Sequence, residues 1–218
     1  MIRYARFLLL CLLLLIPLNS AYAQAGNLPQ LFESNDQALS VRAPANWVGV
    51  DATSIVNSPI YNHVIVTGDN QAAIEAMLAA NYAGGNMNAI EGKAGLFVSI
   101  NRQVFQELTG KEGSALNVFA VALLGVQQAG YTYEGPIEYQ LGDTTAYAIA
   151  IYYGEVASFS MLFERGGLLI GGDLYTSNPN PVEDVPLFLE IFNSLVSPSE
   201  NRQIDQTQNT GMLQGLTN

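Results

Sequence analysis

The sequence predicts an α+β domain, an α/β/α sandwich in which helices cover both faces of a central antiparallel sheet. Three observations lead to this fold class. Between residues 137 and 175, strand-like runs alternate with glycine-containing turns. Three other segments, at about 70–82, 114–128 and 184–197, carry apolar residues at helical spacing. One strand of the series, 144–153, is apolar on both faces, so a layer of helices must cover each side.

The run from 137 to 175 divides into four strands. Gly142-Asp143, Gly154-Glu155 and Gly166-Gly167 separate them, and each pair contains a glycine that can adopt the positive φ of a tight hairpin turn. We therefore expect a four-stranded antiparallel meander. The expected strands are 137–141, 144–153, 156–165 and 168–175.

Each expected helix carries its own boundary signals. Asn70 and Ser114 are placed to cap the first two helices, because a short polar side chain can accept a hydrogen bond from a free N–H of the first turn. Asp184 is placed to cap the third, with Pro186 in its first turn, where a missing N–H costs nothing. Pro198 marks the end of that third helix.

Further strands are expected before the meander. Residues 31–33 and 38–43 read as two short strands joined by the turn-prone Ser34-Asn35-Asp36. Two β-branched runs, 63–67 and 96–100, read as strands of the main sheet.

The start of the chain has the pattern of a secretory signal peptide. Arg3 and Arg6 precede a short apolar run, and Ala21-Tyr22-Ala23 follows as a cleavage signal, so we expect cleavage near Ala23 and an extracytoplasmic location, either secreted or in the periplasm or cell envelope. The expected organisation is a signal peptide at 1–23, a linker at 24–30, one domain at 31–198 and a disordered polar tail at 199–218.

Charge and cysteine content exclude several function classes. The chain has 8 basic and 19 acidic residues, a formal charge of −11, and loss of Arg3 and Arg6 with the signal would lower it to −13. So acidic a chain repels phosphate backbones, which excludes nucleic acid and anionic membrane surfaces as expected partners. Its one cysteine, Cys11, lies in the signal, so residues 24–218 have no disulfide, thiolate nucleophile or cysteine metal site.

Several short stretches together resemble the PsbP-like superfamily over about residues 31–198. They are the turn Ser34-Asn35-Asp36, the strand Leu39-Ser40-Val41, Pro44-x-x-Trp47, and the helix end Asn193-Ser194-Leu195. That superfamily includes the extrinsic lumenal subunit of photosystem II, a nuclear-transport factor that binds the Ran GTPase, and DcrB-related envelope proteins. The chain looks closest to its secreted bacterial members, although it has Asp36-Gln37 where many relatives have Asp-Gly.

The resemblance implies an α/β/α sandwich, usually without catalysis, that serves as a partner-binding or assembly module. It implies no catalytic, metal-binding or cofactor-binding residue for this chain. It does not identify a partner.

Aromatic residues offer two candidate contact features. Trp47 follows Pro44, which cannot continue a central strand, so we expect the indole to fold back over the sheet edge and be buried; the alternative is an exposed ligand platform. Tyrosines are frequent in and near the meander, and exposed tyrosines are favoured at interfaces. The candidate interaction surface is Tyr147, Tyr152, Tyr153 and Tyr175, with ordinary sheet filling as the alternative.

Residues that could carry chemistry are few and scattered. His63 is the only histidine, and no sequence motif supplies the orienting partner that a general base needs. Two carboxylate pairs, Glu134 with Glu138 and Glu183 with Asp184, could serve a glycosidase but are better explained as structural.

Asp51 and Asp69-Asn70 offer oxygen ligands for loose calcium binding without forming a calcium loop. We predict no catalytic, metal or cofactor site. The leading hypothesis is a secreted, non-enzymatic protein-binding or assembly module. The alternative is an acidic secreted hydrolase or small-ligand-binding protein, with its site in the loops 81–92 or 130–135.

Overall fold

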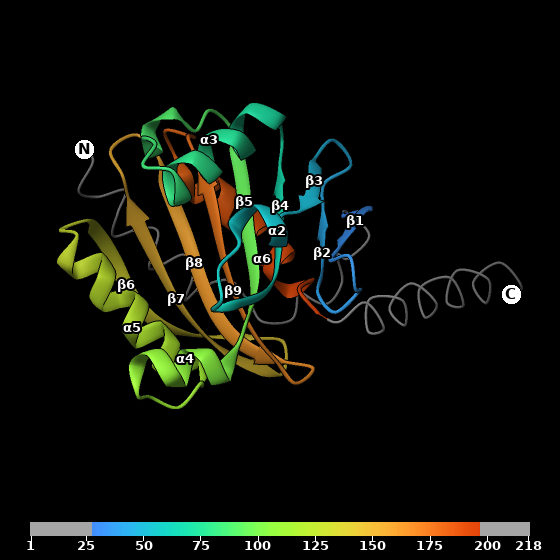
Figure 1. Cartoon of the computed structure of the whole chain (residues 1–218). Coiled ribbons are helices and arrows are strands. Elements are labelled where there is room, and N and C mark those ends of the chain that lie inside the picture. Colours follow the sequence, from blue (N-terminus) through green and yellow to red (C-terminus); the bar gives the residue numbers. More distant parts are fainter. Residues whose placement is uncertain (1–27, 197–218) are drawn as a thin grey trace, which may run out of the picture.

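The computed structural model describes residues 28–196, which fold around one antiparallel sheet (Figure 1). Seven strands form this sheet in the spatial order β3-β4-β5-β9-β8-β7-β6. Their bounds are β3 (Val48–Asp51), β4 (Tyr61–Gly68), β5 (Lys93–Ile100), β6 (Thr132–Leu141), β7 (Thr144–Tyr152), β8 (Ala157–Arg165) and β9 (Leu168–Thr176). The α+β sandwich and the meander β6-β7-β8-β9 predicted from the sequence are both confirmed.

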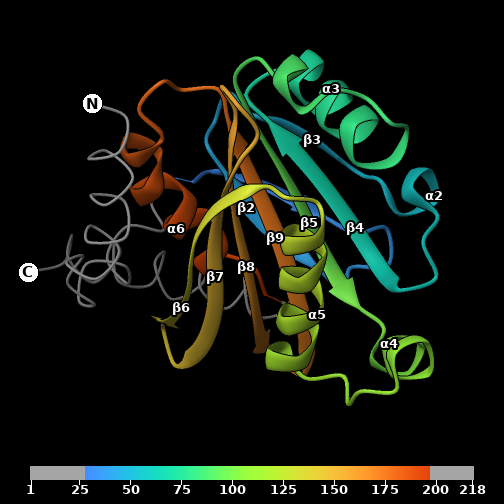
Figure 2. The same cartoon turned by 90° about the vertical axis from the view of Figure 1, so that its left-hand side faces the viewer.

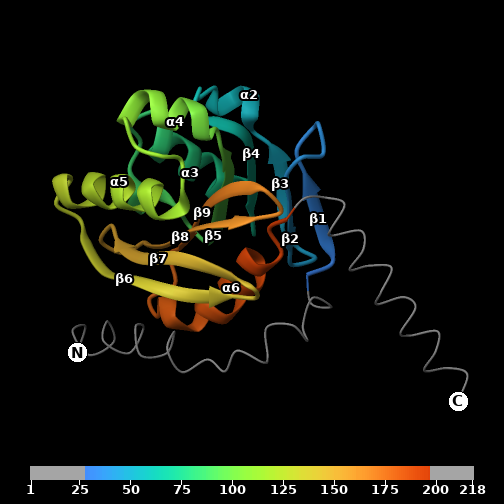
Figure 3. The same cartoon turned by 90° about the horizontal axis from the view of Figure 1, so that it is seen from below.

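Helices cover both faces of the sheet. On one face lie α2 (Thr53–Val56), α3 (Gln71–Tyr82), α4 (Arg102–Thr109) and α5 (Ala115–Gln128), and on the other lies α6 (Val185–Asn193), as Figures 2 and 3 show. Two short 3-10 helices, η3 (Met87–Ala89) and η4 (Pro181–Asp184), lie between these elements. Each face buries its own apolar cluster, so β7 is indeed apolar on both sides.

The face under α6 is also covered by a separate hairpin of β1 (Gln30–Glu33) and β2 (Ser40–Ala43). The two strands and their turn are as expected, except that β2 begins at residue 40 rather than 38. In the turn between them, the Ser34 hydroxyl accepts hydrogen bonds from the N–H groups of Ala38 and Leu39 and donates one to Asp36. Gln37 has φ 59°, a conformation that favours glycine.

The start signals of α3 and α5 are confirmed, and α6 does begin after Asp184 with Pro186 in its first turn, but the expected capping hydrogen bond of Asp184 is wrong. Asn70 accepts from the N–H of Ala73, and Ser114 accepts from that of Asn117. Asp184 makes no capping hydrogen bond; its carboxylate instead accepts a hydrogen bond from Thr176 at 2.7 Å and pairs with Lys93 at 3.3 Å. The Asp184 side chain therefore contacts β9 and β5 instead of capping α6.

The end of α6 and the start of β6 also differ from the expected bounds. The helix ends at Asn193 rather than 197, because the next residues turn back and Val196 bridges to Ser40 of β2. Strand β6 begins at Thr132 rather than 137. Gly135, which belongs to the expected loop 130–135, and Pro136 both lie inside the strand, where its register with β7 shifts.

The N-terminal part of the domain is more tightly packed than expected. Trp47 is 4% exposed within the α6-side cluster, which confirms the buried anchor and not the ligand platform. Leu28, assigned to the linker, is buried in the same cluster. The predicted signal peptide and polar tail lie outside the described residues. Within 28–196, no helix has the length and apolar character needed to span a membrane.

Candidate functional site

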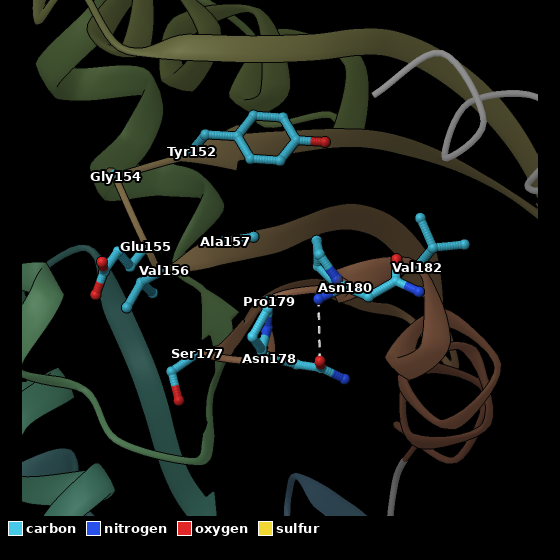
Figure 4. Close-up of a pocket in the computed structure, with 11 residues that line it drawn as sticks. Tyr152, Gly154, Glu155, Val156, Ala157, Ser177, Asn178, Pro179, Asn180 and Val182 are labelled. Atoms are coloured by element: carbon cyan, nitrogen blue, oxygen red, sulfur yellow. Dashed lines mark hydrogen bonds between the residues drawn. The ribbon is translucent and has the colours of Figure 1, made fainter. Parts of the chain in front are cut away.

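Two concave sites are candidates for binding. The first, which we call the outer hollow, has a volume of about 420 Å³ and lies where the turn after β7 meets the segment between β9 and η4 (Figure 4). Its polar groups are largely engaged with each other or with neighbouring backbone. The Asn178 side chain accepts from the N–H of Asn180, and the Ser177 hydroxyl accepts from the N–H of Gly92. The ring of Tyr152 forms one wall.

The second site, which we call the inner pocket, lies between α5 and the sheet. Its volume is about 340 Å³, within the range of small-ligand sites. Apolar side chains from the sheet and from α5 make most of its lining, Phe105 of α4 contributes, and Ala122 of α5 is an exposed lining residue. Figure 2 shows α5 in front of the sheet and α4 beside it. The lining residues from helices come mostly from α5.

A few polar groups converge inside this apolar lining. Asp173 lies on β9 opposite Ser160 of β8, and the Ser160 hydroxyl donates a hydrogen bond to its carboxylate. Tyr61, Tyr153 and Tyr175 also line the pocket, and the Tyr175 hydroxyl donates to the Asn81 side chain at 3.2 Å. An apolar cavity with a small number of convergent polar groups is the usual form of a ligand site.

Asp173 is a carboxylate held among protein atoms on a central strand. The residue as a whole is half-buried, and its exposed part lines the inner pocket. Desolvation raises its pKa above the ordinary value of 3.8, and the hydrogen bond from Ser160 offsets only part of that effect. Its negative charge is therefore poorly solvated by the protein itself.

The Asp173 carboxylate also raises the pKa values of the neighbouring tyrosines. Burial is the first cause that raises the pKa of Tyr61, of Tyr153 (to about 12) and of Tyr175, and the nearby Asp173 carboxylate is the second. Burial likewise raises the pKa of Tyr82 at the end of α3, with smaller contributions from Tyr61 and Asp173. All four hydroxyls are therefore neutral in acid and neutral solution.

The four tyrosines proposed as an interaction surface do not share one face. Tyr147, Tyr153 and Tyr175 lie on the α5 side of the sheet, whereas Tyr152 packs on the α6 side. Tyr175 is 2% exposed, and the others are half-buried. Side chains alternate between the faces of a strand, so the neighbours Tyr152 and Tyr153 point in opposite directions. The prediction that these four tyrosines form a single surface is therefore wrong. Tyr153 and Tyr175 line the inner pocket instead.

The lone histidine has partners that the sequence did not reveal. Its Nδ1 lies 2.6 Å from the Ser99 hydroxyl, and its Nε2 lies 2.7 Å from the Asp36 carboxylate. Ser99 is 1% exposed, so a substrate cannot reach its hydroxyl. In a serine hydrolase the nucleophile faces the substrate. This Ser99–His63–Asp36 chain therefore fastens the β1–β2 turn to the sheet.

The candidate carboxylate pairs are not catalytic pairs. Glu134 lies opposite Ala150 and Glu138 opposite Tyr147, which belong to different faces of the sheet, so the register shift sends the two glutamates to opposite sides. In the second pair, exposed Glu183 accepts a hydrogen bond from Asn180, while Asp184 pairs with Lys93. Neither pair faces a common cavity.

Asp51 and Asp69, considered above as oxygen ligands for calcium, instead accept hydrogen bonds from neighbouring residues. Asp51 accepts hydrogen bonds from the N–H groups of Asn35 and Thr53, and these outweigh burial to lower its pKa. Asp69 accepts from the Asn70 side chain. Between residues 28 and 196, no three His, Cys, Asp or Glu side chains gather as a metal site.

Sequence reasoning missed Asp173 as a site residue, although one signal was present. It is the single charged residue in Leu168–Thr176, a strand otherwise made of apolar residues, glycine, Tyr175 and Thr176. Of the two loops named for the alternative function, 81–92 supplies Asn81 to the inner pocket and 130–135 supplies no lining residue.

The fold and the inner pocket together define an α+β sandwich with a ligand-sized cavity on one face of its sheet. No protein-family model matches the chain, and no curated protein matches it. Among solved structures, it is similar to the cyanobacterial PsbP (CyanoP) of Synechocystis, with 17% identity over 77% of this chain and 91% of that chain and a TM-score of 0.46. A likeness of this extent transfers no function.

Proposed function

We propose that this chain is an extracytoplasmic, non-enzymatic binding protein that holds a small, largely apolar ligand in the inner pocket. The observation that carries the proposal is the pocket itself, about 340 Å³ of mostly apolar lining with Asp173, Ser160 and Tyr153 converging inside it. The signal-peptide pattern of residues 1–23 supports the location. The burial of Ser99 and the separation of Glu134 from Glu138 support binding without hydrolysis.

Occlusion of the pocket tests this proposal. Ala122 lines it and is exposed, so Ala122→Phe adds a ring at the pocket without disturbing the core. Ala120→Phe is the matched control, because Ala120 lies on the same helix, is also exposed and does not line the pocket.

The measurement is native mass spectrometry of full-length protein purified from its own cell envelope. We expect a co-purifying small molecule on the wild type and on Ala120→Phe, and its loss from Ala122→Phe. The same small molecule on all three proteins would place binding elsewhere and overturn the proposal.

A second candidate is the protein-partner function, favoured by the position of Tyr152 in the outer hollow beside Pro179 and Val182. Affinity purification of tagged full-length protein from the envelope tests it. We expect one envelope protein in near-stoichiometric yield, lost with Tyr152→Ser and kept with Tyr139→Ser, a half-buried tyrosine on the same face outside the hollow. Equal recovery with both variants would exclude the outer hollow.

A further inference from the structure

Asp173 is the one charged side chain among the lining residues of the inner pocket, all of which lie within 28–196. Two cations of the described chain are paired with other carboxylates: Lys93 with Asp184 and Arg102 with Glu164. No Lys, Arg or His of the described chain lines the pocket. The carboxylate therefore has a hydrogen-bond donor in Ser160 but no protein cation beside it.

An unpaired carboxylate in such surroundings is unfavourable. Buried charges in proteins are normally paired with an opposite charge or with a metal, because the low-dielectric surroundings do not replace their hydration. A neutral side chain at position 173 would avoid this cost. The carboxylate instead lies at a cavity wall, where a charge brought by a ligand can reach it.

The aromatic lining suits a positive charge as well. Tyr61, Tyr153 and Tyr175 line the pocket together with Phe105 and Phe119. Tyr153 and Tyr175 lie side by side, their ring centroids 6.4 Å apart. Aromatic faces attract organic cations, and aromatic cages of this kind recognise alkylammonium groups. The tyrosine hydroxyls, whose pKa values are raised, stay neutral, and Asp173 is the one acidic side chain among the lining residues that a cation can pair with.

We infer that the inner pocket binds an organic cation, a ligand whose ammonium group pairs with Asp173 and whose apolar body lies between α5 and the sheet. This inference rests on the proposed function and adds the charge of the ligand to it. The formal charge of −11 acts in the same direction, because a strongly acidic protein concentrates small cations near its surface.

Two matched probes test the inference. 4-Phenylbutylamine is a cation at neutral pH, and 4-phenyl-1-butanol has the same apolar body without the charge. Isothermal titration calorimetry on the full-length protein measures both affinities. We expect the amine to bind about tenfold more tightly than the alcohol, since a charge-assisted hydrogen bond is about twice as strong as a neutral one.

The variants separate charge from cavity. Asp173→Asn keeps the shape and the acceptor for Ser160, so we expect it to weaken the amine about tenfold and to leave the alcohol within about twofold. Asp143→Asn, at an exposed turn, removes the same charge from the chain and should change neither affinity. A cooperative urea transition of each variant shows that it is folded.

The outcomes distinguish the two proposals. Equal affinity of the two probes, both lost in Ala122→Phe, would overturn the cation inference and leave the proposed small-ligand function standing. Binding that neither Asp173→Asn nor Ala122→Phe alters would overturn both. Tighter binding of the alcohol than of the amine would show that Asp173 acts as a neutral hydrogen-bond donor, which also overturns the cation inference.

Discussion

The strongest prediction on stability concerns Asp173→Asn. In the free protein the Asp173 carboxylate is partly stripped of water without a cation beside it, and desolvation raises its pKa above 3.8. Asparagine keeps the volume and can still accept the hydrogen bond from Ser160. We therefore expect the variant to be more stable than the wild type at neutral pH, which is unusual for a change in a central strand.

The size of the gain follows from proton linkage. A carboxyl whose pKa is raised by folding binds more protons in the folded state, so the stability of the wild type falls as pH rises from 3.8 towards the folded pKa. Asparagine does not titrate. The difference in unfolding free energy, variant minus wild type, should therefore be near zero at about pH 3, grow by at most about 1.4 kcal/mol per pH unit, and level off above the folded pKa.

Urea denaturation followed by tryptophan fluorescence measures this difference, because Trp47 is the only tryptophan and is buried. Tyr61, Tyr82, Tyr153 and Tyr175 do not titrate in this range, since their pKa values are raised. Asp143→Asn is the control and should track the wild type. A difference that is flat with pH, or a variant less stable than the wild type above pH 6, would refute the reasoning.

Two further predictions concern the N-terminal part of the domain. Trp47→Ala removes a side chain that is 4% exposed and should lower the free energy of unfolding by about 3–5 kcal/mol, measured by urea denaturation with circular dichroism; a loss below about 1 kcal/mol would contradict the buried anchor. Gln37→Gly relieves a left-handed backbone at φ 59° and should raise the free energy of unfolding by about 0.5–1 kcal/mol, with Asn35→Gly as a control outside that conformation.

The meander was predictable because its signals are local. Gly142, Gly154 and Gly166-Gly167 all have positive φ, and each turn joins strands that pair directly along the chain. The helices at 71–82 and 115–128 were found for the same reason, through caps only a few residues from the groups they bond. Such interactions depend on spacing alone.

The inner pocket was not predictable because its parts meet only after folding. Tyr61, Asn81, Phe105 and Ala122 come from four elements, and they surround Asp173 through pairing of β9 with β5 and β8. The Ser99–His63–Asp36 chain was missed for the same reason, since its members are separated by 36 and 27 positions.

The glutamates of β6 show how a local irregularity decides which face of a sheet a side chain occupies. Residues four apart on a regular strand share a face, so Glu134 and Glu138 would lie on the same side of a regular β6. The register shift at Gly135 and Pro136 adds a residue and reverses the face, as the opposite positions of Ala150 and Tyr147 demonstrate. The structural interpretation of this pair is therefore the one that the register supports.

The segment Gly171-Gly172-Asp173 brings the argument for a ligand site together. A side chain at Gly172 would lie 2.8 Å from Phe97 and Phe192, so packing on the α6 side requires that glycine. Gly171 lines the inner pocket, and a methyl group there would lie 3.3 Å from Val98, so packing also favours glycine at this position. Packing explains both glycines, but it does not explain the charge at position 173, which lines the same pocket. Local choices that weaken a core occur mainly where a protein binds or reacts, and Asp173 is such a choice.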